Sequence, residues 1–193
     1  MSDTRREVDY YKEIALGLKD LFISNMPDSL HVSVYPLIGE IKAALQNLIL
    51  NEKVDERLIK PIIQGIDTLS LDVSFLLVNN KTKKYEIVIL EIKRTSAVGL
   101  TELSQLIGYC LVSKAKFGIL VNVDNTVSSR FSTILERDFD LTIIERTLKN
   151  DQDIVHKFGV MKWNSKTLAF EYTNAGSIKS IPELVEMVTQ SLK

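Results

Sequence analysis

Three charged residues interrupt two apolar runs in the middle of the chain. Asp72 opens the first run, and Glu91 and Lys93 close the second, within residues 71–95, LDVSFLLVNNKTKKYEIVILEIKRT. A charge in a strand that faces a core on both sides is costly unless it is paired. Two carboxylates and one ammonium group at the ends of buried strands therefore indicate a chemical site.

The two apolar runs predict an antiparallel hairpin with a turn centred between Lys81 and Thr82. Counting outward from this turn places Asp72 directly opposite Glu91, and Lys93, two residues further on, lies on the same face as Glu91. Opposed carboxylates destabilise a strand pair unless a partner neutralises them. Lys93 supplies one positive charge, and a divalent cation such as Mg²⁺, held by carboxylates, water and a substrate phosphate, supplies two. The pattern predicts an open metal site.

The elements around the hairpin are predicted from hydrophobic periodicity. Before the hairpin we expect helices over 5–24, over 37–50 after Pro36, and over 55–66. After it we expect a helix over 99–114, a buried strand over 115–123, a helix over 126–138 and a strand over 141–148. The tail predicts a second hairpin about residues 164–166 and a closing helix over 180–193, with Ser180 as N-cap. This order predicts an α/β fold, a mixed sheet with helices on its faces.

Composition narrows the class of protein. With 193 residues and no repeat or flexible linker, we expect one domain over 1–193. No apolar run is long enough to cross a membrane, and the charged N-terminus favours a cytoplasmic protein. The net charge of −1 excludes nucleic-acid binding through overall charge, so any phosphate contacts must be local. The local candidates are Lys81, Lys83, Lys84, Lys93, Arg94, Lys114 and Lys116.

Asp72, followed nineteen residues later by Glu91-Ile92-Lys93, resembles the motif of the PD-(D/E)XK, or restriction-endonuclease-like, nuclease superfamily. The resemblance covers about residues 35–123, and Leu71 stands where the motif has proline. It implies an αβββαβ core over about 35–147, with a glutamate on a helix before the hairpin and a glutamine and a tyrosine on the helix after it. Glu40 matches the glutamate, with Glu7 and Glu13 on the first helix as alternatives, and Gln105 and Tyr109 match the later helix.

This resemblance implies metal-dependent hydrolysis of phosphodiester bonds, of DNA rather than RNA, with Mg²⁺ as cofactor and Mn²⁺ as a substitute. Asp72, Glu91 and the backbone carbonyl of Ile92 would bind the metal, with Glu40 as a further ligand. Lys93 would orient or deprotonate the attacking water. Gln105 and Tyr109 would support the site, and nucleic acid would be contacted by Lys81, Lys83, Lys84 and Arg94. Since nucleases that cut both strands often work as dimers, the tail hairpin and last helix are candidates for a homodimer interface.

Other interpretations stay open. The same fold could bind nucleic acid or a protein without cleaving anything, and an unrelated small-molecule site is a third option. Each site residue also has a structural interpretation. Glu91 and Lys93 could form a salt bridge on an edge strand, Asp72 could begin a strand, Gln105 and Tyr109 could lie at an ordinary helix interface, and Glu40 could be a solvated helix residue.

Overall fold

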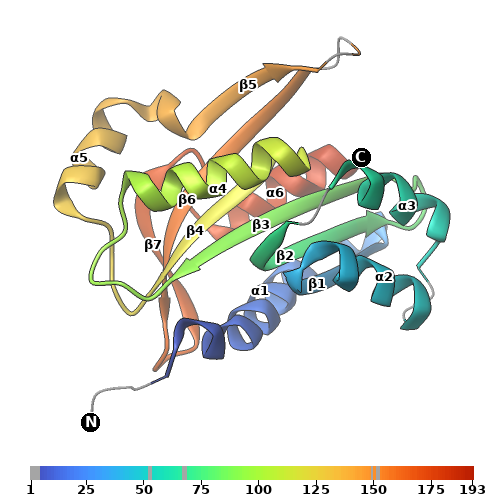
Figure 1. Cartoon of the computed structure of the whole chain (residues 1–193), viewed down its shortest axis with the longest axis horizontal. Coiled ribbons are helices and arrows are strands. Elements are labelled where there is room, and N and C mark those ends of the chain that lie inside the picture. Colours follow the sequence, from blue (N-terminus) through green and yellow to red (C-terminus); the bar gives the residue numbers. More distant parts are fainter. Residues whose placement is uncertain (1–4, 52–53, 67–68, 149, 151–152) are drawn as a thin grey trace.

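The computed structural model describes residues 5–51, 54–66, 69–148, 150 and 153–193, and places helices on both faces of a mixed sheet (Figure 1). The strands are β1 (Val32–Glu40), β2 (Ser70–Asn79), β3 (Tyr85–Lys93), β4 (Phe117–Val123), β5 (Ile143–Thr147), β6 (Asp153–Asn164) and β7 (Ala169–Gly176). The helices are α1 (Tyr11–Asn25), α2 (Ile41–Asn51), α3 (Glu56–Gly65), α4 (Leu100–Ser113), α5 (Ser129–Arg137) and α6 (Ile181–Leu192). A short 3₁₀ helix, η1 (Glu7–Tyr10), precedes α1. The predicted α/β class is confirmed.

The sheet is largely antiparallel. Its strand order is β1-β2-β3-β4-β6-β5, and β7 pairs with β6. The first three strands form an antiparallel meander, whereas β4 runs parallel to β3, and β6 parallel to β4. The hairpin therefore lies in the interior of the sheet, and the interpretation of Glu91 and Lys93 as edge-strand residues is wrong.

The predicted hairpin register is confirmed over its described ladder. The pairs run from Val73 opposite Leu90 to Val78 opposite Tyr85. In the turn, the Asn79 Oδ1 accepts hydrogen bonds from the backbone N–H groups of Lys81 and Thr82, at 2.9 and 3.1 Å. Because one side-chain oxygen organises two turn amides, the turn fixes the register that brings Asp72 to the level of Glu91.

Two hydrophobic cores cover the two faces of the hairpin. Phe75 and Leu90 belong to the core under α1 and α6, whereas Leu76 and Ile89 belong to the core under α2, α3, α4 and α5. Both faces are buried, which explains why β2 and β3 read as continuous apolar runs instead of alternating ones. The charged ends of these strands are the exceptions.

One prediction is wrong: residues 37–40 are the end of strand β1 and not the start of a helix. This strand was missed because Pro36 lies in it and because residues 37–50 also have helical periodicity. Proline is tolerated in edge strands, since there its missing N–H leaves no ladder bond unmade, and β1 is an edge strand. Glu40 therefore ends β1, opposite Ser70, and does not lie on a helix.

The C-terminal elements follow the prediction. β6 and β7 form the second hairpin, and the Ser180 Oγ caps α6 by accepting a hydrogen bond from the Glu183 N–H at 3.2 Å. Leu184 and Val188 of α6 are buried in the core shared with α1, so the apolar face of this helix packs within the chain. A homodimer interface there stays a prediction. Across the part of the chain that the structure describes, every helix is too short or too polar to span a bilayer.

Candidate active site

A β-bulge places Asp72 at the end of the sheet. In the β1–β2 ladder, Ile38 pairs with Val73 and Gly39 with Leu71, so Asp72 is the extra residue without a partner on β1. Gly39 has a φ of 81°, a left-handed conformation that glycine adopts without strain. Bulges redirect side chains and frequently lie next to active sites.

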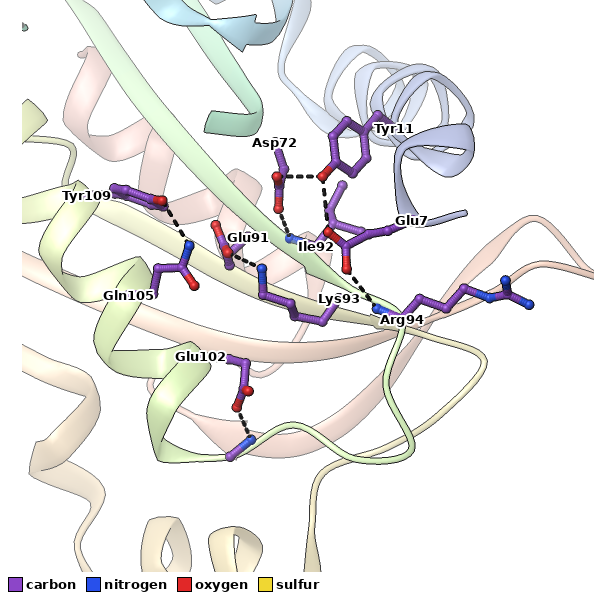
Figure 2. A network of polar contacts seen from close by, with 11 residues as sticks. Glu7, Tyr11, Asp72, Glu91, Ile92, Lys93, Arg94, Glu102, Gln105 and Tyr109 are labelled. Carbon is purple, nitrogen blue, oxygen red and sulfur yellow. Dashed lines mark hydrogen bonds and ion pairs between the residues drawn. The ribbon is translucent and has the colours of Figure 1, made fainter. Parts of the chain in front are cut away.

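The Asp72 carboxylate is held by two hydrogen bonds (Figure 2). Its Oδ2 accepts the backbone N–H of Ile92 at 2.8 Å, and its Oδ1 accepts the Tyr11 hydroxyl at 2.5 Å. The hydroxyl also lies 3.2 Å from Glu7 Oε1, but a phenol carries one proton and the shorter contact is to Asp72. Burial and the hydrogen bond to Asp72 raise the pKa of Tyr11, so the phenol remains a donor at neutral pH.

Glu91 and Lys93 form a largely buried ion pair. Their side chains are 2% and 19% exposed, and Lys93 Nζ contacts Glu91 Oε1. Burial raises the pKa of Glu91, Lys93 opposes this, and the nearby carboxylates of Asp72 and Glu7 raise it further. Burial alone would lower the pKa of Lys93, but Glu91 and the two other carboxylates outweigh it and raise this pKa. Lys93 is therefore a fixed cation, suited to orienting water and stabilising negative charge rather than to accepting a proton.

Among the three candidate glutamates, Glu7 reaches the site. Its Oε2 accepts the backbone N–H of Arg94 at 3.1 Å, and its Oε1 contacts Tyr11, so it lies beside Asp72 at the end of β3. Glu40 is exposed at the end of β1. Glu13 binds Arg5 at 2.8 Å. Of Glu40, Glu7 and Glu13, the geometry therefore favours Glu7 as the glutamate that completes the site.

Gln105 and Tyr109 lie one helical turn apart on α4, and the Gln105 amide donates to the Tyr109 hydroxyl at 2.9 Å. Figure 2 shows both on the part of α4 that faces Glu91. The start of the same helix is fixed by Glu102, whose Oε2 accepts the Gly99 N–H at 2.8 Å. Gln105 and Tyr109 therefore line the approach to Glu91, and their hydrogen bond joins them to each other.

Two residues of the site were missed in the sequence. Tyr11 lies at helical spacing with the apolar residues of the first helix, so the pattern alone predicts a core side chain, whereas the fully buried tyrosine is Tyr10 beside it. Asn122 is buried in β4 opposite Lys93, and its amide bonds Thr95 and Thr126, at 3.1–3.2 Å, so it fixes the loop that follows Lys93. The signal for Asn122 was visible, because it is the one polar letter in the apolar run FGILVNV.

The predicted nucleic-acid contacts divide between the two ends of the hairpin. Arg94 lies at the site, with its guanidinium 5.6 Å from the centre of the Tyr10 ring. The turn lysines Lys81, Lys83 and Lys84 lie at the opposite end. The eight steps of β3 from Tyr85 to Lys93 span about 26 Å at about 3.3 Å per residue, so one phosphate cannot contact both ends.

The donor chemistry of the site suits a hard divalent cation. Glu7, Asp72 and Glu91 bring carboxylate oxygens, and Lys93 offsets one of their formal charges. As arranged here, Asp72 and Glu7 both contact Tyr11 and Glu91 contacts Lys93, so the three carboxylates do not meet at one point. Within the described ranges, no group of three or more His, Cys, Asp or Glu side chains is placed to hold a metal ion. The residue types fit a cation, and binding it would require Glu91 to turn from Lys93 toward Asp72, which Tyr11 and the Ile92 N–H hold in place.

Comparisons with protein-family models, with curated proteins and with solved structures found no match to the chain. The site is therefore interpreted from its own residues.

Proposed function

We propose that this protein is a metal-dependent nuclease that hydrolyses phosphodiester bonds of nucleic acid, with DNA as the favoured substrate. The observation that carries the proposal is the buried Glu91–Lys93 ion pair beside a carboxylate, Asp72, that a β-bulge turns toward the same strand end. The order of α1, β1, β2, β3, α4 and β4 corresponds to αβββαβ only when α2 and α3, which lie between β1 and β2, are set aside and α1, outside the expected core of 35–147, is taken as the first helix.

Each residue has a role that its surroundings support. A divalent cation bound by Asp72 and Glu91, with the Ile92 carbonyl as the further ligand that the resemblance implies, would polarise the phosphoryl oxygen and lower the pKa of a bound water. Lys93, held as a cation, would orient the attacking water and stabilise charge that develops on the phosphate. Glu7 would take the role first assigned to Glu40. Tyr11 and the Ile92 N–H would hold Asp72 in position.

The test is cleavage of supercoiled plasmid DNA with Mg²⁺ or Mn²⁺. Asp72→Asn and Lys93→Ala should each lower the nicking rate at least about 100-fold, because each removes a group that acts on the reacting phosphate. Glu136→Gln, an exposed carboxylate on α5, is the matched control and should cut like wild type. Circular dichroism establishes that each variant is folded. Wild-type rates in folded Asp72→Asn and Lys93→Ala would show that the site is assigned wrongly.

A second candidate is a protein of this fold that binds nucleic acid without cutting it. The observation that favours it is that the carboxylates contact Tyr11 and Lys93 and do not converge. Isothermal titration with Mn²⁺ separates the two proposals. Heat of binding that disappears in Asp72→Asn supports the nuclease, whereas wild-type protein that binds no Mn²⁺ supports the binding protein.

A further inference from the structure

A cleft of about 610 Å³ lies at the end of the sheet opposite the candidate active site. Its lining includes three cations, Lys114, Lys116 and Arg146, and the ring of Tyr85. One carboxylate, Glu86, is also part of the lining. The lining residues that the structure describes therefore carry a net formal charge of +2, although the chain as a whole carries a net charge of −1.

The fold brings this cleft and the turn lysines to the same end. β3 and β4 run parallel, so Tyr85 at the start of β3 and Lys116 just before β4 share one edge of the sheet. The turn that carries Lys81, Lys83 and Lys84 leads directly into Tyr85. In Figure 1 this turn and the C-terminal end of α4, which Lys114 follows, lie toward the same side of the molecule. We call this cleft, which Lys114 lines, together with the turn lysines Lys81, Lys83 and Lys84, the basic end.

Internal contacts account for part of this charge. Lys116 Nζ pairs with Glu86 at 2.5 Å and bonds Ser191 Oγ at 2.7 Å, which ties β3 to α6. Arg146 donates to the Leu111 carbonyl of α4 at 2.8 Å. In the described structure, by contrast, the ammonium groups of Lys81, Lys83, Lys84 and Lys114 make neither an ion pair nor a hydrogen bond, and all four residues are exposed. Contacts within the described chain therefore give no structural role to these four positive charges.

A second, narrower groove extends from the basic end between α3 and α4. Its lining comes from α3 and the residue after it, from β3 and from the end of α4: Pro61, Ile62, Ile66, Tyr85, Glu86, Ile87, Ser113 and Lys114. Further along α4 toward the site come Tyr109 and Gln105, which face Glu91. Ser113 of the groove bonds the Tyr109 carbonyl one turn back along α4, so the same helix carries both the groove residues and the residues that face Glu91.

We propose that the basic end binds the phosphate backbone of the same nucleic acid that the candidate active site cleaves, about 26 Å from the scissile bond. This inference rests on the proposed function and adds a requirement on the substrate. At 3.4 Å per nucleotide along a strand, 26 Å corresponds to about eight base pairs. A duplex must therefore extend about eight base pairs to one side of the cut to reach both contacts, and shorter duplexes lose the distal contact.

Binding without cleavage isolates this contact. Fluorescence anisotropy in EDTA, with a labelled 24-base-pair duplex, compares wild type with the triple variant Lys81→Gln, Lys84→Gln, Lys114→Gln. Removing three phosphate contacts should weaken binding at least 10-fold and flatten the plot of log K against log salt by about 2–3, since each contact contributes about 0.9 to the slope. A variant with Lys19→Gln and Lys166→Gln, lysines outside the basic end, is the control and should bind like wild type.

Duplex length supplies the second measurement. In EDTA, a 24-base-pair and a six-base-pair duplex can both occupy the basic end, so the variant should lose affinity for each. With Mn²⁺, cleavage of the six-base-pair duplex, which is too short to reach both ends, should be the same in the variant and in wild type. With Mn²⁺, the same variant should raise KM on the long duplex and leave kcat unchanged. Equal binding by the basic-end and control variants overturns the inference, as does wild-type protein that binds neither duplex.

Failure of this inference differs from failure of the proposed function. If wild type cuts plasmid DNA while the basic-end variant binds and cuts like the control, the nuclease stands and the distal contact is refuted. If the basic-end variant loses affinity in EDTA and wild type cuts with neither Mg²⁺ nor Mn²⁺, the phosphate contact is supported and the nuclease activity is refuted.

Discussion

At the scale of single residues, the site is a chain of contacts in which Tyr11 connects two carboxylates. Its hydroxyl donates to Asp72 and touches Glu7, and its pKa is raised, so it remains protonated beside them. A neutral donor between two anions fixes their orientation without adding charge. Groups that orient metal ligands in this way commonly affect metal affinity strongly.

Tyr11→Phe tests this orienting role. Without the hydroxyl, Asp72 keeps only its hydrogen bond from the Ile92 N–H, and its carboxylate is free to rotate. We expect the affinity for Mn²⁺ to fall by about 10-fold or more, measured by isothermal titration. Tyr172→Phe, which removes an exposed hydroxyl on β7, should leave the affinity unchanged. Equal Mn²⁺ affinity in wild type and Tyr11→Phe would contradict the role.

At the scale of elements, the site depends on close packing around β6, which supports β4 and therefore β3. Gly159 lies in β6 where a Cβ would come within 2.4 Å of the Ile178 carbonyl oxygen. That oxygen belongs to the backbone and cannot yield as a flexible side chain can. Gly108 in the middle of α4 is different, because nothing lies within 4 Å of a Cβ built there.

Alanine at these two glycines should have opposite effects. Gly159→Ala should lower the free energy of unfolding by about 1–3 kcal/mol through overpacking. Gly108→Ala should raise it by about 0.5–1 kcal/mol, because alanine is the better helix former. Urea unfolding followed by circular dichroism measures both. A Gly159→Ala protein as stable as wild type would show that β6 and the segment after β7 are packed less tightly than described.

Sequence reasoning predicted some elements better than others, for physical reasons. The hairpin register follows from a turn of fixed centre and a period of two, so the pairing of Val73 with Leu90 could be derived by counting. Strand β1 could not be predicted in this way. Its proline argued against a strand, although edge strands tolerate proline, and the last residues of β1 also have helical periodicity. Glu7 rather than Glu40 reaches the site because η1 packs at the end of β3, a tertiary contact that leaves no local pattern.

At the scale of the whole molecule, charge is separated along the sheet. Glu7, Asp72 and Glu91 gather at one end, and the exposed lysines of the basic end gather at the other. Lys93 and Arg94 offset two of the three carboxylates at the first end, whereas the four lysines at the other end have no ion-pair partner in the described structure. Such separation favours one orientation of a polyanion, with its backbone on the lysines and one phosphate delivered to the carboxylates.

His156 should make the stability of the whole protein depend on pH. It is fully buried, its Nδ1 lies 2.7 Å from the Ala115 carbonyl, and within the described structure its Nε2 has no hydrogen-bond partner. Burial, together with Arg146, lowers its pKa below the ordinary value of 6.5. The unfolded chain therefore binds this proton before the folded protein does. The free energy of unfolding should fall as the pH drops below 6.5, by up to about 1.4 kcal/mol per pH unit.

His156→Gln removes this titration and keeps an amide that can donate to Ala115. Urea unfolding between about pH 7.5 and about pH 5.5 should show a smaller loss of stability for this variant than for wild type. His31→Gln changes an exposed histidine and should retain the wild-type slope. A His156→Gln slope equal to that of wild type would assign the acid sensitivity to other groups.

The position of Asp72 follows from the number of residues in β2, because Asp72 is the extra residue at the β1–β2 bulge. Val73 and Leu71 lie on either side of it yet belong to different cores, which a strand without the bulge could not achieve. Exchanging one apolar residue of β2 for another leaves this count intact. Deleting Asp72 would remove the bulge and make Leu71 the direct neighbour of Val73, so ordinary alternation would keep both side chains in their present cores. The extra residue therefore adds a carboxylate at the end of β2 without changing which core its two neighbours enter.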